Sequence, residues 1–135
     1  MQPIIEVQHL FKKYQDVTAV DGVSFTVGRG EFFGLLGPNG AGKTTTIRML
    51  YAFSPPTRGV IRIFGMDIAR DWRRIKARIG VCQQDNTLDP DLTVEQNLIV
   101  FAGYFSIPSK EAKARARELL EFFALSGRRG AKVMD

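Results

Sequence analysis

The opening of the chain alternates apolar and polar residues in a way that is typical of half-buried β-strands. Alternation from Ile4 to Leu10 predicts one strand, and a second strand-like run extends from Val17 to Val27. The turn-forming group Tyr14-Gln15-Asp16 lies between them, so we expect the two runs to pair antiparallel. A later apolar run, Gly59 to Gly65, predicts a further strand.

Two shorter apolar runs, Glu31 to Leu36 and Ile79 to Cys82, are typical of buried strands. Helical spacing of apolar residues predicts helices at Thr45 to Ala52 and at Arg70 to Ala77. Strands and helices therefore alternate through the first part of the chain, which indicates an α/β fold with an antiparallel β subdomain.

The character of the chain changes at residue 92, where apolar residues begin to recur at helical spacing. Thr93 can cap a helix together with Gln96 three residues later, and Ser109 can cap a second helix. The predicted organisation is a core over residues 1–91, the start of a helical subdomain over residues 92–125 and a tail over residues 126–135.

Length and composition exclude several classes of protein. A chain of 135 residues suffices for one modest domain. The longest apolar stretch, Leu98 to Phe105, is far shorter than the roughly 18 residues of a membrane span, and no signal-peptide pattern begins the chain, so we expect a cytoplasmic protein. Cys82 is the only cysteine, which excludes an internal disulfide, and we expect its thiol to be buried.

The net charge of +5 does not by itself indicate nucleic-acid binding. Lysine and arginine residues are scattered through residues 70–78 and 110–117 among helix-forming residues, which is the usual pattern of a solvated helix face. We therefore expect no nucleic-acid partner.

Residues Gly37 to Thr44 read Gly-Pro-Asn-Gly-Ala-Gly-Lys-Thr, a complete match to the phosphate-binding loop pattern. The predicted strand before the loop and the predicted helix after it supply the required context. Backbone N–H groups of such a loop point at a phosphate chain, and glycines leave room for its approach. The pattern predicts a nucleotide-binding protein, with a purely structural glycine-rich turn as the alternative.

Lys43 can bring an ammonium charge to the terminal phosphates, and Thr44 can offer its hydroxyl to Mg²⁺. The candidate nucleotide-binding residues of this region are Gly37, Pro38, Asn39, Gly40, Ala41, Gly42, Lys43, Thr44 and Thr45.

Together these motifs resemble the ATP-binding subunit of an ABC transporter, across essentially the whole chain but only the first half of that family's domain. The resemblance implies a P-loop NTPase fold of ABC type, here incomplete. It also implies that Tyr14, in Phe11-Lys12-Lys13-Tyr14, stacks on the adenine of ATP. Taken alone, a tyrosine at a hairpin is more often simple packing.

The same resemblance assigns Gln84 to the family's Q-loop, where a glutamine contacts Mg²⁺ or the attacking water. Gln84 is preferred over its neighbour Gln83 because of its spacing from Ile79-Gly80. The implied catalytic residues are therefore Lys43 and Gln84, and the implied Mg²⁺ ligands are Thr44 and Gln84.

The stretch from Gln84 to Leu98 is similar to exporters of the ABC-2 type, which include drug-resistance and nodulation-factor export ATPases. The resemblance implies ATP and Mg²⁺ as cofactors, and a transmembrane permease subunit and a second ATP-binding subunit as partners. It places the protein on the inner face of the cell membrane.

The family's hydrolytic parts are a Leu-Ser-Gly-Gly signature, a strand ending in Asp-Glu and a later histidine. Leu125-Ser126-Gly127 imitates the signature, but Arg128 replaces its second glycine, so we expect a coincidental turn. The strand ending in Asp-Glu, which supplies the general base, and the later histidine are missing from this sequence, so the chain alone is expected to bind ATP without useful hydrolysis. We also expect uncovered apolar surface, and with it marginal stability or self-association of the chain alone.

Two other functions stay open. A non-catalytic fragment could bind a membrane partner through the helical lobe at residues 92–125. A P-loop kinase or GTPase is the remote alternative. A guanine-reading Asn-Lys-x-Asp segment is missing, since none of Asn39, Asn86 and Asn97 precedes a lysine.

Overall fold

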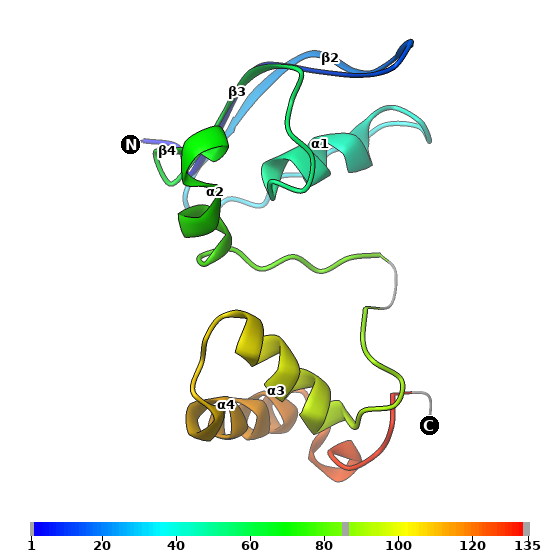
Figure 1. The fold of residues 1–135 in the computed structure, drawn as a ribbon, viewed down its shortest axis with the longest axis vertical. Coiled ribbons are helices and arrows are strands. Elements are labelled where there is room, and N and C mark those ends of the chain that lie inside the picture. Colours follow the sequence, from blue (N-terminus) through cyan, green and yellow to red (C-terminus); the bar gives the residue numbers. More distant parts are fainter. Residues whose placement is uncertain (1, 85–86, 134–135) are drawn as a thin grey trace. The chain divides into compact units, whose positions relative to one another are not determined.

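The computed structural model describes residues 2–84 and 87–133, which form an N-terminal unit within residues 1–81 and a C-terminal unit within residues 82–135. The N-terminal unit contains β1 (Ile5–Tyr14), β2 (Val17–Val27), α1 (Lys43–Leu50), β3 (Arg58–Ile63), β4 (Met66–Asp67) and α2 (Ile68–Lys76) (Figure 1). The C-terminal unit contains α3 (Val94–Tyr104), α4 (Ser109–Phe122) and the 3₁₀ turn η1 (Ser126–Arg128). Asp85 and Asn86, in the stretch that resembles exporters, lie outside the described residues, as do the last two residues of the tail.

The N-terminal unit is built on an antiparallel sheet with the strand order β2-β1-β3-β4. The predicted β1–β2 hairpin is confirmed, with Gln15 in its turn at a φ of 47°. The predicted strand at residues 59–65 is confirmed as β3, displaced by one or two residues. β1 pairs with β2 from Ile5 to Tyr14 and with β3 from Ile5 to Phe11, so hydrogen bonds hold most of the strand on both sides.

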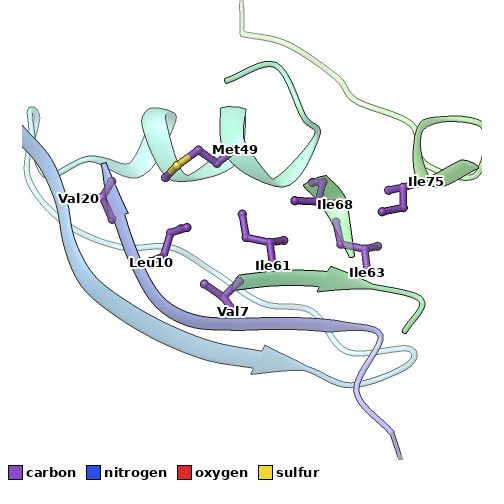
Figure 2. Close-up of a cluster of buried hydrophobic side chains, with 8 residues drawn as sticks. All are labelled: Val7, Leu10, Val20, Met49, Ile61, Ile63, Ile68 and Ile75. Atoms are coloured by element: carbon purple, nitrogen blue, oxygen red, sulfur yellow. The ribbon is translucent and has the colours of Figure 1, made fainter. Parts of the chain in front are cut away.

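One face of the sheet carries the hydrophobic core of this unit. Side chains from three strands point toward α1 and α2, which supply the rest of the core (Figure 2). The buried members are Val7, Leu10, Val20, Met49, Ile61, Ile63, Ile68 and Ile75. Their burial fixes the position of α1, and with it the start of that helix, relative to β1 and β2.

Two predicted strands are wrong. Residues 31–36 and 79–82 run as irregular chain. Leu36 is 95% exposed, and Phe33 stacks on Phe25 of β2 with ring centroids 4.8 Å apart. A short apolar run becomes a strand only when a neighbouring strand accepts its hydrogen bonds, and its own sequence does not specify that neighbour.

Cys82 corrects a further expectation, since its side chain is exposed instead of buried. The run at residues 79–82 forms no strand, so no sheet covers this thiol. Exposed apolar side chains in the same two segments, such as Phe32 and Leu36, agree with the expectation of uncovered apolar surface.

The predicted helices in the N-terminal unit are confirmed as α1 and α2, each beginning two residues earlier than expected. In α2 the reason is a cap: the Asp67 carboxylate accepts a hydrogen bond from the N–H of Ala69 at 2.8 Å.

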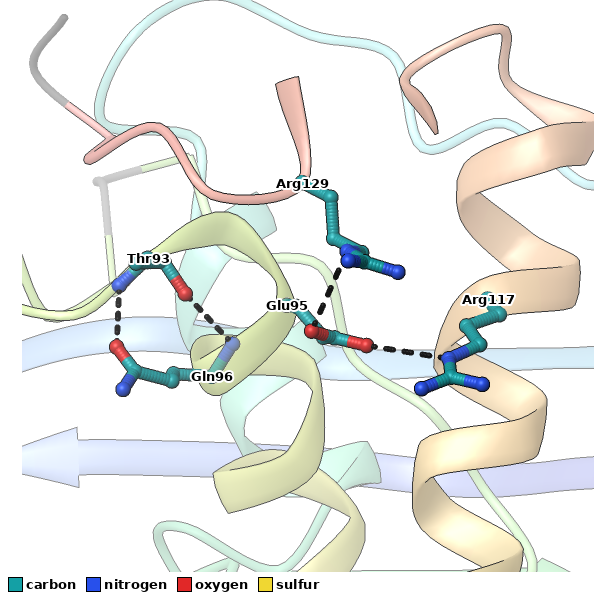
Figure 3. A network of polar contacts seen from close by, with 5 residues as sticks. All are labelled: Thr93, Glu95, Gln96, Arg117 and Arg129. Atoms are coloured by element: carbon teal, nitrogen blue, oxygen red, sulfur yellow. Dashed lines mark hydrogen bonds and ion pairs between the residues drawn. The ribbon is translucent and has the colours of Figure 1, made fainter. Parts of the chain in front are cut away.

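The C-terminal unit begins its first helix with the predicted capping box. Thr93 Oγ1 accepts from the N–H of Gln96 at 3.2 Å, and Gln96 Oε1 accepts from the N–H of Thr93 at 2.8 Å (Figure 3). The predicted cap at Ser109 is wrong. The carbonyl of Pro108 already accepts from Ala112 at 2.9 Å, so Ser109 is the first helical residue instead of the cap.

The tail folds back onto the start of α3. The N–H groups of Val94 and Glu95 donate to the carbonyls of Ala131 and Arg129 at 3.0 and 3.2 Å. The predicted coincidental turn at Leu125-Ser126-Gly127 is the 3₁₀ turn η1 together with the residue before it. The predicted domain boundaries after residues 91 and 125 stay a prediction.

Candidate nucleotide-binding site

The candidate site begins where the loop of residues 37–42 enters α1. The N–H of Ala41 donates to the carbonyl of Pro38 at 3.2 Å, which closes a turn inside the loop. The first intrahelical bond then runs from Thr46 N–H to Gly42 O at 2.8 Å. The N-cap is Gly42, in a left-handed conformation, and because it is a glycine it has no side chain that could cap the helix. The first turn of α1 holds no acidic residue. The helix start is therefore open to an anionic ligand.

Gly42 has a steric reason to be glycine. Its φ is 82°, a conformation that other residues adopt at a cost. A Cβ at this position would also overlap the carbonyl oxygen of Ala19 and press on Cγ2 of Val20. The loop thus packs directly on β2, because nothing separates its backbone from the strand.

Lys43 folds back over the loop that precedes it. Its Nζ donates to the carbonyl oxygens of Gly37 at 2.6 Å and Pro38 at 2.7 Å. These two carbonyl oxygens are the acceptors for which phosphate oxygens can substitute. Next to Lys43 in the same first turn, Thr44 is exposed, so its hydroxyl is accessible to a hydrated cation.

Tyr14 lies at the end of β1, opposite Val17 of β2. Its side chain is 45% exposed, its hydroxyl lies 3.5 Å from Ser54 Oγ, and Lys12 Nζ lies 4.8 Å from its ring centroid. Lys12 pairs with the core residue Val20, so alternation places Tyr14 on the same face of the sheet, the face that α1 covers.

The loop contacts β2, because Gly42 packs on Ala19 and Val20. The contacts of Tyr14 are with Lys12 and with Ser54, which follows the end of α1, so a site shared by Tyr14 and the loop stays a prediction. Gln83 and Gln84 are both exposed and belong to the C-terminal unit, so the assignment of Gln84 to the site stays a prediction.

Sequence reasoning missed Lys12. Only 9% of this lysine is exposed, and its Nζ donates to the carbonyl of Pro55 at 2.7 Å. The signal was present, because Lys12 follows the apolar Leu10 by two residues and precedes Tyr14 by two. In a strand, that spacing places all three residues on one face.

In residues 2–84 and 87–133, no group of three or more His, Cys, Asp and Glu residues is arranged to hold a metal ion. Among the helices of those same residues, none combines the length and apolar character needed to cross a membrane.

Comparison with known proteins decides the family. A family model described as ABC transporter matches residues 20–134. The chain belongs to the ABC transporter family. Members of this family are ATPases that bind ATP. The predicted family and its fold class, including the antiparallel β subdomain, are confirmed.

Curated relatives carry the name Nod factor export ATP-binding protein I. The relative from Paraburkholderia xenovorans is 48% identical over 97% of this chain and 43% of its own length. The relative from Rhizobium meliloti is 44% identical over 97% of this chain and 39% of its own length. The chain therefore spans about two fifths of these ABC proteins.

Solved structures give the same fold. An ATP-binding subunit of an ABC transporter superposes with a TM-score of 0.82 at 31% identity, over 96% of this chain and 54% of that one. A dimeric ATP-binding cassette in a post-hydrolysis state, bound to ADP and Pi, gives a TM-score of 0.83 at 23% identity, over 96% of this chain and 62% of that one. At that identity the second likeness shows the fold alone.

Proposed function

We propose that this chain is the ATP-binding part of an ABC transporter ATPase and binds MgATP at residues 37–45. The observation that carries the proposal is the open N-terminus of α1, with Lys43 already folded over the glycine loop in front of it. Uncapped N–H groups, the helix dipole and an ammonium converge there, and together they favour a polyphosphate.

In this proposal the Lys43 ammonium leaves the carbonyls of Gly37 and Pro38 for the terminal phosphates of ATP. Thr44 supplies a hydroxyl ligand to Mg²⁺, whose charge neutralises the phosphates. Tyr14 takes the adenine on the exposed part of its ring. Gln84, in preference to Gln83, completes the site toward Mg²⁺ and the water.

The names of the relatives support a role in export. We therefore propose that the chain works with a transmembrane permease and a second ATP-binding subunit on the inner face of the cell membrane. We also propose that it binds ATP without useful turnover when alone, which an assay of phosphate release from MgATP would test.

The first test is a calorimetric titration of MgATP and MgGTP into the unaltered chain and into Lys43→Ala. We expect saturable MgATP binding that weakens at least tenfold in the variant, because one charge-assisted contact to phosphate is lost (about 1.5–3 kcal/mol). Lys113→Ala, on the exposed face of α4, is the matched control with the same change of charge and should bind normally. Equal affinity for MgATP in all three proteins would refute the proposal.

A second candidate function rests on the C-terminal unit. Several aromatic side chains of α3 and α4 are exposed, including Tyr104 at 75% and Phe122 at 80%. A surface of this kind favours contact with another protein. A chain that binds no MgATP but associates with a permease would fit this candidate better than the first one.

A further inference from the structure

Lys12 is a buried cation that has no role in the ATP site proposed above. Its place on the core side of β1, opposite Val20, removes its ammonium from bulk water, which is costly unless partners replace the water. One partner is the carbonyl of Pro55, at 2.7 Å. The other is the ring of Tyr14, whose centroid lies 4.8 Å from Nζ.

Both partners depend on the same turn between α1 and β3. Pro55 accepts the hydrogen bond from Lys12, and the adjacent Ser54 has its Oγ 3.5 Å from the Tyr14 hydroxyl. The ring of Tyr14 is therefore contacted at two points, by the ammonium of Lys12 and at its hydroxyl. Nearly half of the side chain still remains exposed to a ligand.

We propose that Lys12 is a positioning residue that holds the Tyr14 ring in place for the purine base of a nucleotide. The inference rests on the proposed function, in which Tyr14 takes the adenine. A ring already held by a cation loses less conformational freedom when a base stacks on it. Lys12 acts only through Tyr14, so its effect is confined to the base and does not extend to the phosphates.

The experiment separates these two parts of the ligand. MgATP and magnesium tripolyphosphate, which has no base, are titrated into the unaltered chain, Lys12→Met, Lys12→Arg and Tyr14→Ala. We expect Lys12→Met to weaken MgATP binding roughly 2- to 10-fold and to leave tripolyphosphate binding unchanged. Lys12→Arg keeps the cation and should restore part of the loss.

A double variant and a control complete the design. In the Tyr14→Ala background, Lys12→Met should weaken MgATP binding no further, because the ring through which it acts is gone. Lys13→Met removes the neighbouring lysine, whose side chain is exposed, and should behave as the unaltered chain does.

Each contrary outcome has a distinct meaning. Equal losses for MgATP and tripolyphosphate in Lys12→Met, or a further loss in the Tyr14→Ala background, overturn the positioning role alone. Normal MgATP binding by Tyr14→Ala overturns both the stacking role of Tyr14 and this inference. Failure of the unaltered chain to bind MgATP overturns the proposed function and this inference with it.

One measurement tests the contact without any nucleotide. Lys12 Nζ lies 4.8 Å from the centroid of the Tyr14 ring, so we expect the NMR signals of the adjacent ε-methylene protons to be shifted upfield and to return to ordinary values in Tyr14→Ala. Unshifted signals in the unaltered chain overturn the inference independently of ATP binding.

Discussion

Two helices of this chain begin in opposite ways. The start of α1 is a glycine loop whose cap residue, Gly42, carries no side chain. The start of α3 is closed by the chain itself, through the Thr93–Gln96 box and through the fold-back of the tail onto Val94. Every helix has N–H groups in its first turn without an intrahelical partner. In α3 the protein satisfies several of them internally, whereas in α1 no side chain caps them.

A buried polar side chain, Asn97, lies in the first turn of α3. Asn97 is 3% exposed, and its Oδ1 accepts from the N–H of Asp89 at 2.8 Å. Its Nδ2 donates to the carbonyls of Asp89, Leu92 and Thr93 at 3.0, 3.4 and 3.2 Å. The Asn97 side chain therefore holds residues 89–93 against α3, whereas the loop before α1 is held by a backbone turn and by the Lys43 ammonium. A capping side chain such as Thr93 stabilises the start of α3, but at the start of α1 it would occupy the space in front of the helix N–H groups.

Gly42→Ala changes the N-cap of α1 and should have the largest effect on MgATP binding. The substitution costs about 1–2 kcal/mol for the left-handed conformation, and its Cβ overlaps the Ala19 carbonyl. The loop must then move away from β2, and we expect MgATP affinity to fall more than tenfold by calorimetry. Gly103→Ala, at a position in α3 where the added Cβ meets no atom within 4 Å, should bind MgATP as before.

Asn97→Ala removes hydrogen bonds at the start of α3 and should lower stability. It removes a side chain that is only 3% exposed together with its hydrogen bonds to residues 89–93, at a cost of about 1–3 kcal/mol. We expect amide hydrogen exchange at Asp89 to accelerate by one to two orders of magnitude, with little change in MgATP affinity. Asn97→Asp keeps an acceptor and should preserve more of this protection, so equal exchange in both variants would contradict this account of Asn97.

The same contrast explains how much of the molecule the sequence alone could predict. The β1–β2 hairpin and the capping box of α3 were predictable, because each is specified by residues close together in the chain. The runs at residues 31–36 and 79–82 were not, because a strand's partner is chosen by the whole fold. The exposure of Cys82 has the same cause.

In the candidate site, too, local features were predictable and contacts between distant segments were not. The loop at residues 37–44 was predictable from local pattern, since its glycines meet backbone requirements that only glycine meets easily. The spacing of Lys12 from Leu10 indicates which face of the strand it lies on, but it does not reveal the hydrogen-bond partner, because Pro55 lies far along the chain. Contacts of this kind become visible only when the turn after α1 is seen beside β1.

Glu95→Gln tests the contribution of charge at the start of α3, from which we expect the smallest effect. Glu95 lies 3.6 Å from both Arg117 and Arg129, and it also complements the positive end of α3 (Figure 3). Both arginines are more than half exposed, so solvent screens these ion pairs, and we expect a loss of about 0.3–1 kcal/mol in the free energy of unfolding. The loss should shrink in 1 M salt, where screening removes the electrostatic part. Glu118→Gln, exposed on α4, is the control with the same change of charge. A Glu95→Gln loss that persists unchanged in high salt would mean that the side chain stabilises α3 through packing instead of charge.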